Sequence, residues 1–160
     1  MITCFDDAFA AICGIEGNYS NNPNDPGKAT KFGITEVVAR AWGYNGDMHD
    51  LTIAMAKSIA KTNYWDRFQC GQFDPRIGYL IFDAAFNGGH PIQWLQKAVD
   101  VNQDGVVGPA TICAVRNIEP WRIMARFNAY HAQYYAALDN HTMIDGWVNR
   151  IAYNLLLGAA

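Results

Sequence analysis

The fold is decided by residues 74–86, which read DPRIGYLIFDAAF. The pair Asp74-Pro75 is typical of a helix start, because aspartate accepts hydrogen bonds from free backbone N–H groups and proline fits the first helical position. Apolar side chains then occupy nearly every position at 77–86. A helix without a polar face is normally central in a core. The sequence therefore predicts a buried helix here, ended by the NGGHP sequence at 87–91.

Helical signals continue on both sides of this segment. An apolar stripe with a capping box of Thr3 and Asp6 predicts a first helix that ends at Glu16. Thr35 is expected to cap a short helix that ends before Gly43. Further helices are expected from Asp50 or Thr52 onward and at 91–100, 109–117, 120–138 and 142–157. The segment 19–34 has room only for a small hairpin, so we predict an all-α fold of two helical lobes that share one core.

Composition limits the classes of protein to which the chain can belong. Its 160 residues, 51% of them hydrophobic and 17% charged, suit one well-cored domain. The net charge of −3 and the lack of a basic run argue against nucleic acid as the main partner. No apolar stretch approaches the roughly 18 residues of a membrane span. The sequence MITCFDD at 1–7 lacks the basic region of a secretory signal, so we expect synthesis in the cytoplasm.

The cysteines and histidines suggest no metal centre. Three pairings, or free thiols, are open to the four cysteines, Cys4, Cys13, Cys70 and Cys113. The four histidines show neither an HExxH motif nor another paired spacing. Residues 100–105, which read DVNQDG, copy the first half of a calcium-binding EF-hand loop, but Thr111 stands where that loop needs a glutamate. We therefore expect no metal and no cofactor.

Two acids lie in the stretch 15–35, which reads IEGNYSNNPNDPGKATKFGIT. Glu16 ends the first helix, and Asp25 lies in a segment rich in turn-forming residues. Cleavage of a glycosidic bond needs an acid that protonates the leaving oxygen and a carboxylate that places water or stabilises positive charge. An apolar setting can raise the pKa of one acid while a solvated loop keeps the other ionised. Glu16 is therefore a candidate general acid, the alternative being a helix-end charge beside an Asp turn.

The motifs around these acids resemble family 108 of the glycoside hydrolases, a lysozyme-like group of N-acetylmuramidases. The first half of the resemblance consists of EGxY at 16–19, NPxDPGxxTxxGIT at 22–35, YWD at 64–66 and FDAAxNxG at 82–89. The second half consists of WLQ at 94–96, DGVVGPxT at 104–111 and GWxxR at 146–150. This half resembles the small peptidoglycan-binding region of these enzymes. The resemblance thus implies a lysozyme-like catalytic region at 1–90, a helical peptidoglycan-binding region at 91–160, and peptidoglycan glycan strands as the substrate.

The resemblance also implies residue roles. The catalytic acid of the family maps onto Glu16. The spacing of Glu16, Asp25 and Thr30 is similar to a Glu, Asp and Thr triad in phage-type lysozymes, where Asp and Thr position the attacking water. The threonine of that triad lies one residue farther from its aspartate, so Thr35 stays an alternative. The chain departs from the family pattern at 18 and 28, where Asn and Lys replace glycine, but neither departure touches the proposed acid.

Three further residues are candidates for substrate binding. Tyr19 adjoins Glu16, and Trp65 lies in a family motif, so both are candidates for stacking on sugar rings, with core packing as the alternative. Asn87 follows the central helix and is placed to hydrogen-bond an N-acetyl or hydroxyl group, with a helix C-cap as the alternative.

The function implied is a lysozyme-type hydrolase that cleaves the β-1,4 bond between N-acetylmuramic acid and N-acetylglucosamine. Inversion or retention depends on the separation of the carboxyl groups, which the sequence leaves open. The alternatives are a lytic transglycosylase, which needs one acid alone, and a non-catalytic peptidoglycan-binding or secretion-accessory protein. We expect the protein to reach the cell wall through a holin-like pore, an exporter or lysis. A phage endolysin and a bacterial secretion muramidase both fit, and the sequence leaves the oligomeric state open.

Overall fold

The structure is a computed structural model that describes residues 2–16, 19–21, 28–138 and 143–159, with the backbone alone at 14–16 and 158–159. The described residues are mainly helical and include one small antiparallel sheet, as the sequence predicts. The α-helices are α1 (Phe5–Glu16), α2 (Glu36–Trp42), α3 (Ile53–Ala60), α4 (Pro75–Phe86), α5 (Pro91–Ala98), α6 (Pro109–Arg116), α7 (Pro120–Ala137) and α8 (Ile144–Ala159). No helix among these residues is both long and apolar enough to cross a membrane.

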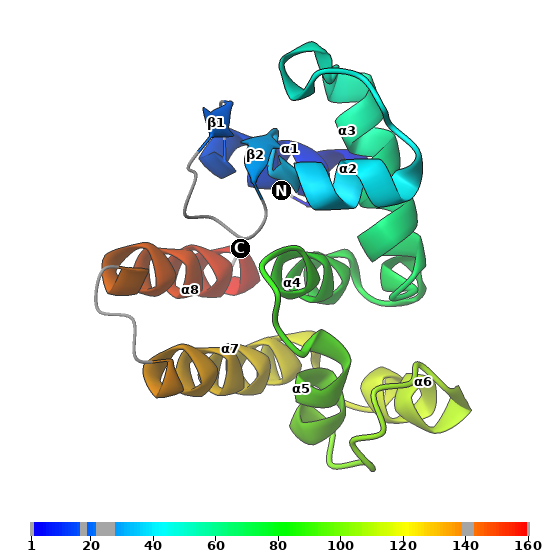
Figure 1. Cartoon of the computed structure of the whole chain (residues 1–160). Helices are drawn as coiled ribbons and strands as arrows, with labels where there is room; N and C mark the ends of the chain where they lie inside the picture. The colour runs from blue at the N-terminus through cyan, green and yellow to red at the C-terminus, as the bar shows by residue number, and fades with distance from the viewer. Residues whose placement is uncertain (1, 17–18, 22–27, 139–142, 160) are drawn as a thin grey trace.

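Helix α4 is the centre of the molecule. Its residues 77–84 are all buried, including the large side chains of Tyr79 and Phe82. In Figure 1, α4 lies between α1, α2 and α3 on one side and α5, α6 and α7 on the other. Buried side chains from both groups form one continuous apolar cluster, which confirms the prediction of two helical groups around a shared core.

Local capping chemistry sets the starts of three helices, α2, α3 and α4. The hydroxyl of Thr35 accepts a hydrogen bond from the N–H of Val38 and caps α2, and Gly43 ends that helix with a left-handed φ of 104°. Thr52, one of the two predicted starts, caps α3. Asp74 caps α4, whose first residue is the predicted proline.

The prediction that Thr3 and Asp6 form a capping box at the start of α1 is wrong about the acidic residue. The carboxylate of Asp7, not that of Asp6, accepts hydrogen bonds from the backbone N–H of Thr3 at 2.8 Å and from its hydroxyl at 2.5 Å. Because α1 begins at Phe5, Asp7 is the third helical residue and is the one that reaches back to Thr3.

The sheet has three short strands, one more than a simple hairpin. Strand β1 (Ser20–Asn21) pairs with β2 (Ala29–Lys31), which pairs with β3 (Ile34–Thr35). Ala29 and Ile34 are buried against the core. Strand residues that neighbour each other along the chain point to opposite faces, so Thr30 and Thr35 lie on the other face of the sheet.

Three short helical segments were not predicted. Two are 3-10 turns, η1 (Met48–Asp50) and η3 (Cys70–Gln72), and the third is a π-helical segment, η2 (Lys61–Asp66), that continues α3. The wider π-turn lies where Trp65 packs edge-on against the rings of Phe5 and Phe82, at centroid distances of 5.5 and 5.8 Å.

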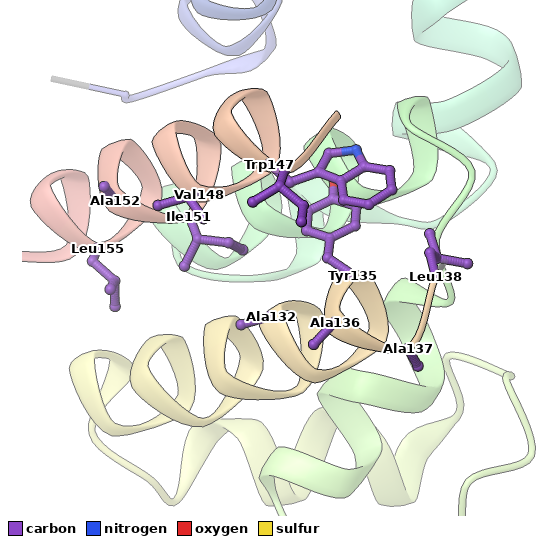
Figure 2. A pocket seen from close by; sticks show the side chains of 11 residues that line it. Ala132, Tyr135, Ala136, Ala137, Leu138, Trp147, Val148, Ile151, Ala152 and Leu155 are labelled. Atoms are coloured by element: carbon purple, nitrogen blue, oxygen red, sulfur yellow. The ribbon is translucent and has the colours of Figure 1, made fainter. Parts of the chain in front are cut away.

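Helices α7 and α8 run side by side in opposite directions (Figure 1). An apolar groove separates their facing sides, and Figure 2 shows its lining by small residues of α7, such as Ala132 and Ala136, and by Val148, Ile151 and Leu155 of α8. At one end of the groove the ring of Trp147 stacks on that of Tyr135, with 4.7 Å between centroids and an angle of 2° between the ring planes.

Candidate active site

Of the two candidate acids, the structure describes the backbone of Glu16 alone. Glu16 is the last residue of α1, as predicted, so the helix fixes where its backbone lies. Earlier residues of α1, Phe9 and Ile12, are buried in the core and anchor the helix. The side chain of Glu16, and Asp25 as a whole, lie outside the described residues.

The structure brings the two candidate threonines together. Thr30 on β2 lies directly opposite Thr35 on β3 and opposite Ser20 on β1. Directly opposite residues share one face of a sheet, so the three hydroxyl-bearing side chains form a row. The hydroxyl of Thr35 caps α2, whereas no described residue hydrogen-bonds the hydroxyl of Thr30. Sequence reasoning missed Ser20, because the pairing register that places it in the row is not visible in the sequence.

Tyr19 is half-buried and its ring stacks on that of His49, with 3.6 Å between centroids and 26° between planes. The backbone carbonyl of His49 accepts a hydrogen bond from the ammonium group of Lys31. One face of the tyrosine ring is thus covered, and a sugar could stack on the opposite face alone.

Trp65 lies in the core. Its side chain is 8% exposed and packs between aromatic rings of α1 and α4. This position favours the core-packing alternative over contact with a sugar.

Asn87 takes the helix-cap role, one of its two predicted alternatives. It is the C-cap of α4, and its side-chain Nδ2 donates to the backbone oxygen of Asp83 at 2.7 Å. It is also half-buried and lines a pocket of about 590 Å³ between the end of α4 and α8. The hydrogen bond to Asp83 fixes the carboxamide of Asn87 beside this pocket.

A buried polar network holds α8 beside α4. The carboxylate of Asp83, which is fully buried, accepts hydrogen bonds from Arg150 at 2.5 Å and from Asn154 at 3.0 Å. Burial, together with the nearby Asp83 charge, raises the pKa of the Tyr79 hydroxyl above its ordinary value. On α7, burial and the positive charge of Arg150 lower the pKa of His131 to about 4, so this histidine is neutral at pH 7.

The calcium-like sequence at 100–105 forms a turn organised by a glutamine. Buried Gln96 donates from Nε2 to Asp104 Oδ1 at 2.7 Å, and its Oε1 accepts from the N–H of Gly105 at 2.9 Å. The N–H of Val106 also donates to Asp104. The hydrogen bonds that Asp104 accepts from the N–H of Val106 and from Gln96 hold the pKa of its carboxyl below the usual value.

Family models match both parts of the chain. A model described as "Glycosyl hydrolase 108" matches residues 9–89, which is half of the chain. The chain belongs to this family. A second model, described as "Predicted Peptidoglycan domain", matches residues 90–152, so this family member carries a C-terminal peptidoglycan-binding region. The two matches together identify a peptidoglycan hydrolase.

A solved structure agrees with this assignment. The structure of Brucella abortus SagA is 29% identical in sequence and superposes with a TM-score of 0.87, covering 97% of this chain and 93% of SagA. None of the curated proteins matches the chain.

In this family member, the pocket beside Asn87 lies where the two matched regions meet. Asn87 belongs to the glycosyl hydrolase match, whereas Trp147 and Arg150 belong to the peptidoglycan match. Sequence reasoning missed two further lining residues, Asn149 and Tyr153. The sequence could have shown that these two residues lie together, because a separation of four positions places both on one side of α8.

Proposed function

We propose that this glycosyl hydrolase is an N-acetylmuramidase. It hydrolyses the β-1,4 bond between N-acetylmuramic acid and N-acetylglucosamine, with Glu16 as the general acid. The observation that carries the proposal is the position of Glu16 at the end of an anchored helix, followed within a few residues by the sheet that carries Thr30. A general acid must be held rigidly against the leaving oxygen, and a helix fixed in the core supplies that rigidity.

In this proposal Asp25 and Thr30 align the attacking water or stabilise the developing charge. Thr30 is preferred over Thr35 because the hydroxyl of Thr35 already accepts the capping hydrogen bond of α2. Tyr19 and Asn87 contact the glycan. Trp65 is left out of the substrate-binding set because its ring is enclosed in the core.

The threonine assignment is tested by a matched pair of variants, Thr30→Ala and Thr35→Ala. Thr30→Ala should lower the rate of peptidoglycan cleavage about tenfold or more with little change in melting temperature. Thr35→Ala should remove a helix cap and lower the free energy of unfolding by about 1 kcal/mol while keeping most of the activity. The reverse pattern, measured by turbidity assay and thermal melting, would move the role to Thr35.

The bond and the reaction class are tested by digesting purified peptidoglycan and analysing the new chain ends by mass spectrometry. The proposal predicts reducing ends of N-acetylmuramic acid. Anhydromuramic ends would instead identify a lytic transglycosylase. Binding to peptidoglycan without any new ends would identify a non-catalytic binding protein.

A further inference from the structure

We propose that the pocket between the end of α4 and α8 binds the acetamido group of a sugar in the glycan strand. This inference rests on the proposed function, since it names a part of the same substrate. The pocket measures about 590 Å³ and is lined by Asn87, Met143, Gly146, Trp147, Asn149, Arg150 and Tyr153. Asn87 belongs to the glycosyl hydrolase match, and the lining residues from Met143 to Arg150 belong to the peptidoglycan match, so a ligand here touches both matched regions.

The lining suits the chemistry of an acetamido group, which has a methyl group, an N–H donor and a carbonyl acceptor. Met143 and the ring of Trp147 supply apolar surface for the methyl group. Asn87 uses its Nδ2 on the backbone oxygen of Asp83, which leaves its Oδ1 as the atom that can accept from the ligand N–H. Asn149 is exposed on the same wall and can donate to the ligand carbonyl.

The charge of the pocket favours a neutral ligand. Arg150 is the one charged residue of the lining set, and its guanidinium forms an ion pair with the buried Asp83 carboxylate at 2.5 Å. Its side chain is 10% exposed. The pair cancels the positive charge that a carboxylate ligand would need. A neutral acetamido sugar therefore fits better than the carboxylates of a stem peptide.

Contacts within the protein also hold the lining of the pocket in place before a ligand binds. The side chain of Trp147, half-buried, is held by its stack on Tyr135, as Figure 2 shows. Tyr153 is 37% exposed on the same helix. The bonds of Arg150 and Asn154 to Asp83 fix the position of α8 against α4. Side chains that are ordered before binding cost little entropy when a ligand arrives, and aromatic rings offer flat apolar faces to sugar C–H groups.

The test is titration of the full-length Glu16→Gln variant with tri-N-acetylchitotriose, followed by ¹⁵N–¹H NMR. This host variant avoids cleavage during the measurement. The trisaccharide should shift the side-chain amide signals of Asn87 and Asn149 and the indole N–H of Trp147. Cellotriose, which is neutral and has hydroxyl groups in place of acetamido groups, should cause no such shifts. In the same host, Asn149→Ala should weaken binding about three- to tenfold, the loss expected for one hydrogen bond to a neutral ligand.

The matched control is Asn102→Ala, which removes an exposed asparagine between α5 and α6, outside the pocket lining, and should leave binding unchanged. Equal shifts with cellotriose, shifts confined to other residues, or unchanged binding in Asn149→Ala would each overturn the inference. Failure here is distinguishable from failure of the proposed function. Muramidase activity without shifts in the pocket would overturn the pocket alone, whereas pocket shifts in a protein that releases no new chain ends would overturn the enzymatic proposal alone.

Discussion

Helices α4 and α8 lie next to each other but are held in the molecule by different forces. Eight residues of α4 are buried, and seven of them carry no charge. Among the described side chains of α8, Asn154 is the buried one, and apolar residues such as Val148 and Leu156 are 60% and 70% exposed. Burial of apolar surface therefore positions α4, whereas hydrogen bonds to Asp83 and the Trp147–Tyr135 stack position α8.

This difference explains where the molecule has open space. An apolar helix seated on the core leaves no gap beside it, because interiors are close-packed. A helix held by a few polar contacts leaves room on both of its flanks, and the pocket beside Asn87 and the groove facing α7 lie there. The proposed acetamido site depends on this looser attachment.

The largest loss of stability should come from removing a buried side chain of α4. Phe82→Ala removes a fully buried ring that contacts Phe5 and Phe86 and should lower the free energy of unfolding by about 3–5 kcal/mol. Leu156→Ala is the control on α8 and should change the free energy of unfolding by less than about 0.5 kcal/mol. Urea unfolding followed by circular dichroism measures both, and similar losses would contradict the contrast between the helices.

The next effect should come from the ion pair that holds α8. Arg150→Met leaves the Asp83 carboxylate buried without its charged partner and should cost about 3 kcal/mol. Hydrogen exchange of the α8 amides should accelerate well before that of α4. Lys57→Met, which removes a solvent-exposed ion pair with Asp6, should cost under about 1 kcal/mol. Equal acceleration in both helices would show that α8 unfolds only with the core.

A smaller effect should appear as a dependence of the free energy of unfolding on pH. His131 has a folded-state pKa of about 4 against an ordinary value of 6.5, so the unfolded chain binds the extra proton first as the pH falls. Stability should therefore be complete above pH 7 and decrease as the pH falls from 6.5 towards 4, by about 2 kcal/mol at pH 5. In His131→Gln this part of the pH dependence should vanish. The exposed His90 supplies the control His90→Gln, which should retain it.

Much of the fold is predictable because helix ends depend on neighbours in sequence. Thr52, Asp74-Pro75 and Pro120 each act within one helical turn, and the helices begin where those residues predict. The π-helical turn at 61–66 was missed because it depends on packing of Trp65 against residues far along the chain. Helix α5 ends at Ala98 instead of 100 because Asp100 adopts a left-handed φ of 59°.

The site was less predictable, for the same physical reason. The apolar stripe of the first helix predicts Glu16 at a helix end, and that placement is local. The neighbouring positions of Thr30 and Thr35 depend on strand register, and the pairing of Asp83 with Arg150 joins residues 67 positions apart. Neither contact leaves a periodic signal in a single sequence. Trp65 shows the limit of a motif, because its place in YWD does not reveal that its ring is buried.

The central claim is that Glu16 is the general acid of a peptidoglycan hydrolase. The most direct test compares the rates at which wild type, Glu16→Gln and Glu36→Gln release soluble fragments from purified peptidoglycan. Glu36 is the matched control, since it lies at the start of α2 and pairs with Arg40 at 3.0 Å. Loss of a transferable proton should slow Glu16→Gln by about 10²–10⁴-fold, while Glu36→Gln stays near the wild-type rate. A folded Glu16→Gln protein that cleaves as fast as wild type would contradict the claim.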